Sequence, residues 1–367
     1  MKMLKLERPE EMLLALLRAA LYRHGVEITY FQHATANDWK QCYLLAVKQG
    51  VVALAWGGVL QLPAEYLPPL ELKLSWGLTE QKQCRKFRKH CQAVHELTQR
   101  CTQHGIAVVV LKGIGLSRLY PVSAYRKLGD IDIYSYSVDK SRMTDEEANR
   151  MVDKLMMEMG IEVIRSSQGK DSHFLYHRIP VENHRMFFDI RRFPVAKEVE
   201  KWLEMHLCSE PIDSLEGMGD IYVPSIDFDT VYLSYHAAIH AGMGLSLHHL
   251  CDWCVLLQQR GTLPAKLMKK PFFFPAIVLT QLCNQYLGTT VPVEGGEEMI
   301  ADMMQEIIRS PYQVKIPYQN PVLSGFYKAR RTLHSLAWMR RLLKPTWGEM
   351  VLPLLHILIK QPGRLIK

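Results

Sequence analysis

The chain has 367 residues, of which 48% are hydrophobic and 22% are charged; such a composition is ordinary for a globular protein with a sizeable core. No run approaches the ~20 apolar residues that span a bilayer, which argues against an integral membrane protein. A formal net charge of +8 favours anionic partners such as nucleotides, nucleic acid or an anionic membrane surface, although the same charge also fits simple solubility.

The eight cysteines are scattered through segments with a helical pattern, and the first residues lack the apolar core and cleavage site of a signal peptide. Both observations predict free thiols and a cytoplasmic protein. Cys251 and Cys254 have the spacing of a redox pair. A CxxC that is isolated inside a helical pattern is usually structural, so we expect no redox role for it.

Residues 1–105 are predicted to form a helical N-terminal region. Asn37 and Asp38 can cap its second helix, and residues 64–104 predict one long helix or a broken pair that ends at Gly105. The middle of this segment is strongly basic, with Lys82, Lys86, Arg88, Lys89 and His90. Such a run is most often a solvated helix face, and a contact with phosphate or nucleic acid is the alternative.

From residue 106 the pattern changes to alternating strands and helices. The predicted strands are 106–111, 129–136, 161–165, 173–177 and 186–190, and the predicted helices are 114–120 and 144–159. Thr144 and the acidic residues after it are typical of a helix start, and Gly160 of a helix end. The alternation predicts an α+β fold with a small mixed sheet and helices on one side.

After about residue 195 the chain is predicted to be largely helical again, with helices at 194–207, 227–241, 247–260, 265–288, 297–309 and 325–343. His236, His240 and Asp252 lie in this region. They could bind a metal, but a place in the helical core or on a substrate-facing surface is the preferred interpretation. Residues 347–367 form a basic amphipathic tail, for which packing or a partner is preferred over a membrane surface.

The segment 108–134 carries the most informative pattern of the chain. An apolar strand, Val108 to Leu111, runs into a glycine turn and a helix, and the next strand contains Asp130 and Asp132. Strand side chains alternate faces, so the two carboxylates are predicted on one side, with Cα atoms roughly 6.5 Å apart. Two like charges on one face call for a cation, and Mg²⁺ prefers such hard oxygen ligands.

This order of glycine turn, helix and Asp-apolar-Asp strand resembles the polymerase-β-like nucleotidyltransferase superfamily. A closer resemblance, to a bacterial family of uncharacterised nucleotidyltransferases (the family 5 type), is carried by Leu111-Lys112-Gly113, Leu119-Tyr120-Pro121, Arg126 and Gly129-Asp130-Ile131-Asp132. It extends through Val181-Glu182-Asn183-His184-Arg185 and toward residues 236–252. The resemblance covers roughly residues 100–260 and implies a nucleotidyltransferase core at 106–195. The hydrophobic pattern predicts the helical region 1–105 before this core, a helical domain at 196–345 after it, and the tail at 346–367.

The resemblance also implies a two-metal site. Asp130 and Asp132 would hold two Mg²⁺ ions, with Mn²⁺ as an alternative, and a third carboxylate on a neighbouring strand would complete the site. Glu182 is the preferred third ligand, because the family places an acidic residue closely followed by a histidine there. Asp189 is the alternative, and it could equally pair with a neighbouring arginine. His184 lies two residues from Glu182 and is predicted on the same strand face.

Four residues are candidates for binding the triphosphate. Gly113 and Gly115 would let the backbone approach it near a helix N-terminus, and Lys112 and Arg126 would neutralise its charge. A tight turn without a ligand is the alternative for the glycines, and a structural ion pair is the alternative for Arg126. Relative to the superfamily, the second small residue is displaced to Gly115, and the connection from Gly113 to Asp130 is long.

The expected function is transfer of a nucleoside monophosphate from an NTP to an acceptor hydroxyl with release of pyrophosphate. The acceptor could be a protein side chain, a small molecule or RNA. A catalytically inactive nucleotide-binding or interaction module of the same fold is the alternative.

Overall fold

The computed structural model describes residues 4–23, 25–166, 169–189, 194–207, 209–212, 221–310 and 320–344. The chain divides into two compact units, and neither is continuous in sequence. The sheet unit comprises Arg8–Asp189 and His206–Asp229. The helical unit comprises Met1–Glu7, Ile190–Met205 and Thr230–Lys367. The predicted tail at 347–367 lies outside the described residues.

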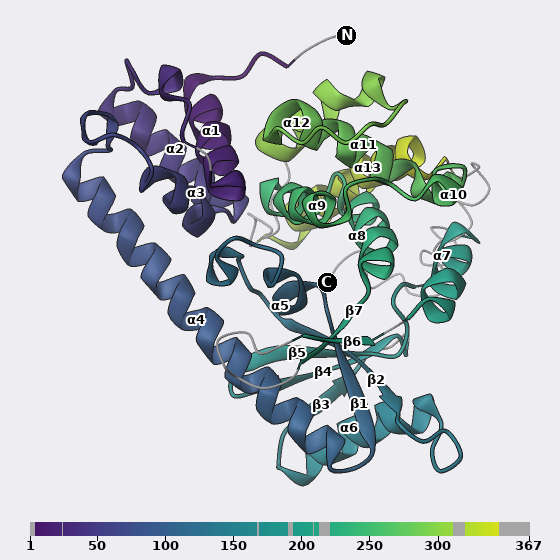
Figure 1. The fold of residues 1–367 in the computed structure, drawn as a ribbon. Helices are drawn as coiled ribbons and strands as arrows, with labels where there is room; N and C mark the ends of the chain where they lie inside the picture. The colour runs from purple at the N-terminus through teal and green to yellow at the C-terminus, as the bar shows by residue number, and fades with distance from the viewer. Residues whose placement is uncertain are drawn as a thin grey trace. The chain divides into compact units, whose positions relative to one another are not determined.

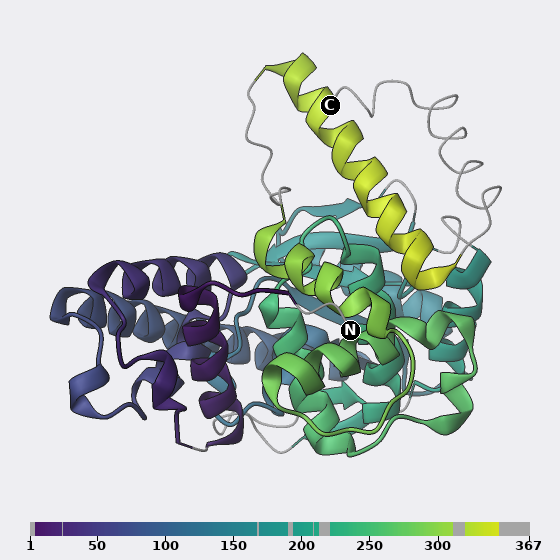
Figure 2. The ribbon, with the colours of Figure 1, turned by 90° about the horizontal axis from the view of Figure 1, so that it is seen from above.

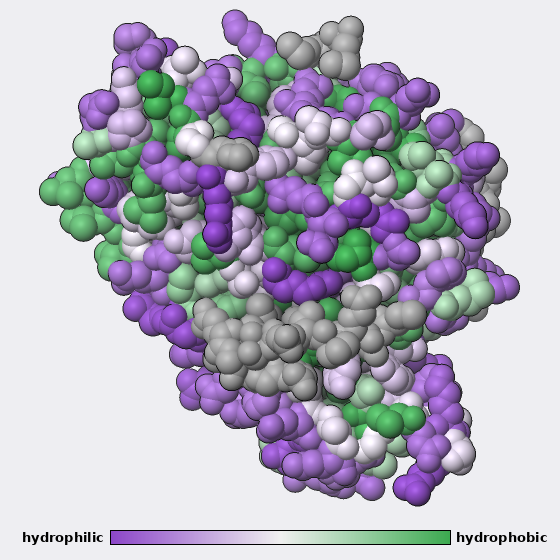
Figure 3. All heavy atoms as spheres, in the orientation of Figure 1, coloured by the Kyte–Doolittle hydropathy of each residue, from purple (hydrophilic) through white to green (hydrophobic). Residues whose placement is uncertain are grey.

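The sheet unit begins with four helices, α1 (Arg8–Tyr22), α2 (Ala36–Gln49), α3 (Val52–Val59) and α4 (Leu70–Thr102). Thr35, rather than the predicted Asn37, is the N-cap of α2, and it forms a capping box with Asp38. Of the two alternatives for the segment 64–104, the structure shows one long helix: α4 runs without interruption after a short 3₁₀ turn (Ala64–Tyr66) and Pro69. Figure 3 shows hydrophobic surface (green, left edge) near this start, where Leu70, Leu74 and Leu78 are exposed.

A mixed seven-stranded sheet follows, with the strand order β3-β4-β5-β2-β1-β7-β6 (Figure 1). Its strands are β1 (Ile106–Leu111), β2 (Ile131–Ser137), β3 (Val163–Arg165), β4 (Asp171–Tyr176), β5 (Ile179–His184), β6 (Ser209–Ile212) and β7 (Ile221–Pro224). β2 is antiparallel to β1 and parallel to β5, and β1 is parallel to β7. The α+β fold with a mixed sheet is therefore confirmed.

One of the predicted strands is wrong. Residues 186–190 were expected to form a strand, but the chain bends at 185–188 and the preceding residues form β5 instead. His177 and Arg178 connect β4 to β5 with positive φ angles of 49° and 65°, so this tight hairpin turn lacks the glycine or asparagine that usually marks one. The region after 195 is largely helical, as predicted, but it also contributes the four-residue strands β6 and β7 to the sheet.

The core of the sheet unit packs α4 and α6 (Asp145–Glu158) against the strands. The buried side chains come from α4, α6 and the strands β1, β2, β4, β5 and β7, and they include Phe87, Val94, Val110, Ile133, Val152, Met156, Val181 and Val223. Thr144 and Glu147 form the predicted capping box at the start of α6. Between β1 and β2 lie the short helix α5 (Lys112–Ser117) and a 3₁₀ turn (Ser123–Tyr125).

The helical unit contains α7 (Pro194–Met205), most of α8 (Ile226–His240), α9 (Leu247–Arg260), α10 (Ala265–Met268), α11 (Phe274–Leu282), α12 (Ile300–Arg309) and α13 (Pro321–Leu343), as Figures 1 and 2 show. The bounds predicted for α9 are confirmed, and the predicted helix 265–288 is divided by a 3₁₀ turn at Pro271–Phe273. Among the described residues, no helix has the length and apolar character required to cross a membrane.

Candidate active site

The turn after β1 is strained and directs a lysine at an aspartate. Lys112 has φ 30° and Gly113 has φ 44°, a conformation that glycine adopts readily and lysine does not. Such strain in a non-glycine residue occurs mainly at functional sites. Leu111 pairs with Asp132 in the β1–β2 register, so the turn brings Lys112 Nζ to 3.0 Å from Asp132 Oδ1.

Asp132 is the best-anchored member of the site and is only 1% exposed. His184 Nε2 donates a hydrogen bond of 2.9 Å to the same Oδ1 atom that Lys112 contacts. Burial opposes the charge of Asp132, but Lys112 and the hydrogen bond from His184 outweigh burial, and the pKa of this carboxyl falls to about 2. The other oxygen, Oδ2, is buried and has no hydrogen-bond partner among the described residues.

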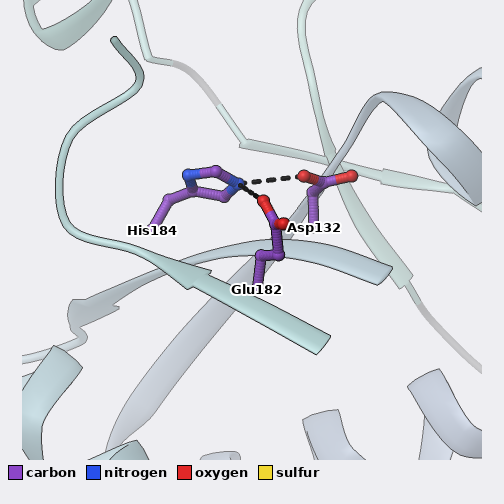
Figure 4. A group of neighbouring side chains, drawn as sticks. All are labelled: Asp132, Glu182 and His184. Atoms are coloured by element: carbon purple, nitrogen blue, oxygen red, sulfur yellow. Dashed lines mark hydrogen bonds and ion pairs between the residues drawn. The ribbon is translucent and has the colours of Figure 1, made fainter. Parts of the chain in front are cut away.

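Glu182 lies directly opposite Asp132, because β5 is the parallel neighbour of β2 and the two residues are partners in the register. His184 follows two residues later on the same strand, and its Nε2 is 3.5 Å from Glu182 Oε2. Figure 4 shows the three side chains pointing toward one another, and their ligand atoms lie within 4.8 Å of each other. Burial and the charge of Asp132 raise the pKa of Glu182.

These residues fit a divalent metal ion with oxygen ligands. The buried Oδ2 of Asp132 needs a partner that the described residues do not supply. Glu182 is held beside a second carboxylate, where its charged form is disfavoured. A cation between the two carboxylates would give the Oδ2 atom of Asp132 a partner and would also stabilise the charged form of Glu182. Carboxylate oxygens are the ligands that Mg²⁺ and Mn²⁺ prefer, and an imidazole nitrogen is also compatible with Mn²⁺.

Asn183 fixes the strand that carries Glu182 and His184. It is completely buried on the opposite face of β5, where its Oδ1 accepts hydrogen bonds from Ser135 (2.7 Å) and Asn149 (2.8 Å). Its Nδ2 donates to the Asn149 carbonyl (3.0 Å) and to Asp153 Oδ1 (3.2 Å). No role for Asn183 was predicted from the sequence. The signal was an amide between two candidate site residues, a position where an apolar side chain would be usual in a buried strand.

Asp130 lies just before β2, is partly exposed, and does not belong to the group of ligand atoms within 4.8 Å. Its charge nevertheless acts on Glu182, whose pKa it helps to raise. Asp189 lies beyond β5 in a segment without regular structure, five residues after His184. The structure thus brings Asp132 and Glu182 together, and the metal-binding role of each acidic residue stays a prediction.

The other predicted phosphate-binding residues have evident structural contacts. Arg126 is buried and its NH1 donates to the Lys127 carbonyl at 3.0 Å. A Cβ atom on Gly115 would lie 2.7 Å from the Val110 carbonyl oxygen, so α5 can pack on β1 only with glycine there. Helix α5 has six residues, and Gly113 within it is not helical, so the dipole at its N-terminus is small.

Four histidines of the helical unit form a cluster through contacts between their rings. The rings of His236 and His240 are 4.3 Å apart, and those of His248 and His249 are 3.8 Å apart. Within the described part of the chain, ligand atoms converge in the group of Asp132, Glu182 and His184 and not in this cluster. Cys251 and Cys254 are buried free thiols, in agreement with a structural CxxC.

Comparison with known proteins gives two matches. Residues 35–270 match a family model described as an uncharacterised nucleotidyltransferase. A solved structure of an antigenic nucleotidyltransferase-like protein from Paracoccidioides brasiliensis aligns with 13% identity and a TM-score of 0.38, over 53% of this chain and 87% of that chain. No curated protein matches the chain.

Proposed function

Because the chain belongs to this family of uncharacterised nucleotidyltransferases, we propose that it transfers a nucleoside monophosphate from an NTP to an acceptor hydroxyl, with Mg²⁺ as the metal. The observation that carries the proposal is the register pair of Asp132 and Glu182 on β2 and β5, with a buried oxygen of Asp132 to which no described residue donates a hydrogen bond. In the reaction, the acceptor oxygen forms a bond to the α-phosphorus, and the bond from that phosphorus to the pyrophosphate oxygen breaks.

Asp132 and Glu182 would hold the metal at the centre of the site, and Asp130, which lies just before β2 and is partly exposed, would hold a second ion. When bound, the ions would activate the acceptor hydroxyl and neutralise the leaving pyrophosphate. Glu182 is the proposed acceptor of the hydroxyl proton, because its carboxylate lies beside Asp132 at the metal site. His184 orients Asp132 through the 2.9 Å hydrogen bond and leaves Oδ2 available.

The triphosphate would lie near the turn after β1. Lys112 is the cation that already faces the site, and it can move from Asp132 to a phosphate oxygen when a metal takes over the charge of the carboxylate. Gly113 has no side chain to block approach, and Arg126 would supply a second positive charge. Gly115 would contribute by keeping α5 close to β1.

One observation favours a second candidate function. Lys112 and His184 both contact Asp132 Oδ1, so the charge of Asp132 is balanced without a metal. A non-catalytic nucleotide-binding module could keep such an arrangement permanently. Binding of NTP that does not depend on a divalent ion, together with the absence of turnover, would identify this alternative.

Turnover of labelled NTP with candidate acceptors tests the proposed reaction. Asp132→Asn and Glu182→Gln should each reduce transfer by a factor of about 10² or more, because each removes a metal ligand. Asp139→Asn, at an exposed acidic residue of the same unit, should leave transfer unchanged. Undiminished transfer in both site variants would refute the mechanism.

The acceptor and the cellular location belong to the same proposal. A protein side chain, a small molecule or RNA can each supply the hydroxyl group. The described cysteines are all free thiols, which fits the reducing cytoplasm.

A further inference from the structure

A basic pocket of about 480 Å³ lies on α4 of the sheet unit, separate from the residues assigned to the triphosphate. Five cationic side chains line it, from Lys82, Arg85, Lys86, Lys89 and Lys127. Thr79, Gln83 and Leu128 complete the lining, whereas Lys112 and Arg126 do not contribute to it.

Among the described residues, no acidic side chain lines this pocket to balance its positive charge. Lys82, Arg85, Lys89 and Lys127 are exposed and form no ion pair with any residue that the structure describes. Burial of the Lys86 ammonium group and the charge of Lys127 lower the pKa of Lys86, while Asp130 acts in the opposite direction. Like charges gathered in one concave site repel each other, and a bound anion would relieve that repulsion.

The pocket is fixed next to the acidic strand. Gln83 Nε2 donates to the Tyr125 carbonyl at 2.8 Å, Lys86 Nζ donates to the Leu128 carbonyl at 2.6 Å, and His90 Nε2 lies 3.1 Å from the Gly129 carbonyl. These contacts hold the loop that continues directly into Asp130 and β2. A molecule bound in the pocket would therefore have a defined position relative to the metal site.

We infer that this pocket binds a phosphate group of a small phosphorylated acceptor, and so positions the acceptor hydroxyl at the metal site. The inference rests on the proposed function, because only a transferase needs an acceptor. The basic residues 82–89 span about 10 Å of helix, which suits one small ligand better than the extended stripe that tracks a nucleic-acid backbone. Lys112 already serves the triphosphate in the proposed reaction, so the pocket remains for the second substrate.

Neighbouring residues of α4 provide a matched pair of variants. Lys89→Glu reverses a charge inside the pocket, and Arg88→Glu reverses an exposed charge next to it that does not line the pocket. Both side chains are exposed, so neither substitution disturbs the core. Calorimetric titration in EDTA measures the affinity for glucose 1-phosphate and for glucose, and it does not depend on metal or turnover.

The parent protein should bind glucose 1-phosphate but not glucose, and Lys89→Glu should weaken this binding about tenfold or more while Arg88→Glu leaves it unchanged. The Michaelis constant for ATP should stay within about twofold of the parent in both variants, if transfer occurs. The pocket assignment is overturned if the two variants bind glucose 1-phosphate equally well, or if the parent does not bind it at millimolar concentration. Either result is decisive whether or not the enzyme is active. A rise in the constant for ATP confined to Lys89→Glu assigns the pocket to the triphosphate instead.

Measuring RNA binding tests the remaining alternative, in which the basic residues of α4 bind a nucleic acid. A short RNA with a 5′-hydroxyl group should bind no more tightly than glucose does. Tight, salt-dependent RNA binding that Lys89→Glu and Arg88→Glu weaken to the same extent would overturn the inference in favour of a nucleic-acid face.

Discussion

The charge of Asp132 is stabilised by its neighbours even without a metal, so its removal is expected to destabilise the fold. Its carboxylate is buried and shared by Lys112 and His184. Asp132→Asn should lower the free energy of unfolding in EDTA by about 1–3 kcal/mol, because Lys112 loses its counter-charge in a partly buried place. Urea denaturation measures the change. Asp139→Asn is the control, and a variant as stable as the parent would show that the ion pair contributes nothing.

Glu182 is predicted to behave in the opposite way. Burial and Asp132 raise its pKa, so its charged form works against the folded state at neutral pH. Glu182→Gln should therefore melt at a higher temperature than the parent in EDTA, and should lose the stabilisation that saturating Mg²⁺ gives to the parent. Thermal unfolding with and without Mg²⁺ tests both statements. If Asp189→Asn loses the Mg²⁺ effect instead, the third carboxylate is Asp189.

At the scale of single residues, the sequence pattern predicted the acidic residues of the site better than the contacts that hold them in place. The Asp-apolar-Asp strand and the nearby Glu-Asn-His segment were visible as motifs, since chemistry requires those residue types. The contact of Lys112 with Asp132 depends on a positive φ angle at a lysine, which no sequence rule predicts. The assignment of Asp130 and Asp132 to one metal-binding face still awaits its test.

Among the elements, β5 depends on one amide. Asn183 connects β5 to β2 through Ser135 and to α6 through Asn149. Asn183→Ala should lower the free energy of unfolding by about 2–4 kcal/mol, because it leaves several buried polar groups without partners. The Kd for Mg²⁺ should rise as well, since Glu182 and His184 lose their fixed position. Asn149→Ala should reproduce both effects. A change in stability with unaltered Mg²⁺ affinity would make Asn183 a folding residue only.

The capping box of α2 provides a pH-dependent prediction. Backbone and side-chain hydrogen bonds from Thr35 lower the pKa of Asp38. Its stabilisation is complete above the unfolded pKa of about 3.9 and is lost as the pH falls through the lower folded value. Asp38→Ala should cost about 1 kcal/mol at pH 7 and much less at pH 2.5. Chemical denaturation at the two pH values measures this. A cost that is the same at both values would exclude the charge as its source.

Elements with strong local signals were predicted well, and those formed by long-range pairing were not. Thr144 with the acidic residues after it and Gly160 marked α6, and the continuous apolar run rich in β-branched residues marked β1. β5 contains Pro180 and follows a turn without glycine, so its polar sequence resembles a loop. β6 and β7 have four residues each. β7 is a strand because it pairs with the edge of β1, and β6 is a strand because it pairs with β7.

For the whole molecule, composition and sequence pattern predicted the fold class but not which segments of the chain form each of the two units. The ordinary hydrophobic content and the change from helical to alternating patterns indicated an α+β protein. No local feature indicated that the chain leaves the sheet unit after Asp189 and returns to it at His206. A chain ended after residue 207 should therefore be insoluble, whereas a chain ended after residue 344 should keep the sheet. The amount of soluble protein and its circular dichroism spectrum, measured for both truncated chains, test these two expectations.

The pairing of β1 with β7 also has a consequence during synthesis. Val109 meets Tyr222 across roughly a hundred residues of chain, a separation that a ribosome takes about 5–20 s to translate. Throughout that interval the nascent chain carries an apolar strand with one open edge, the kind of surface that recruits chaperones or a second nascent chain. Slow codons between residues 112 and 221 would lengthen this exposure, and fast ones would shorten it.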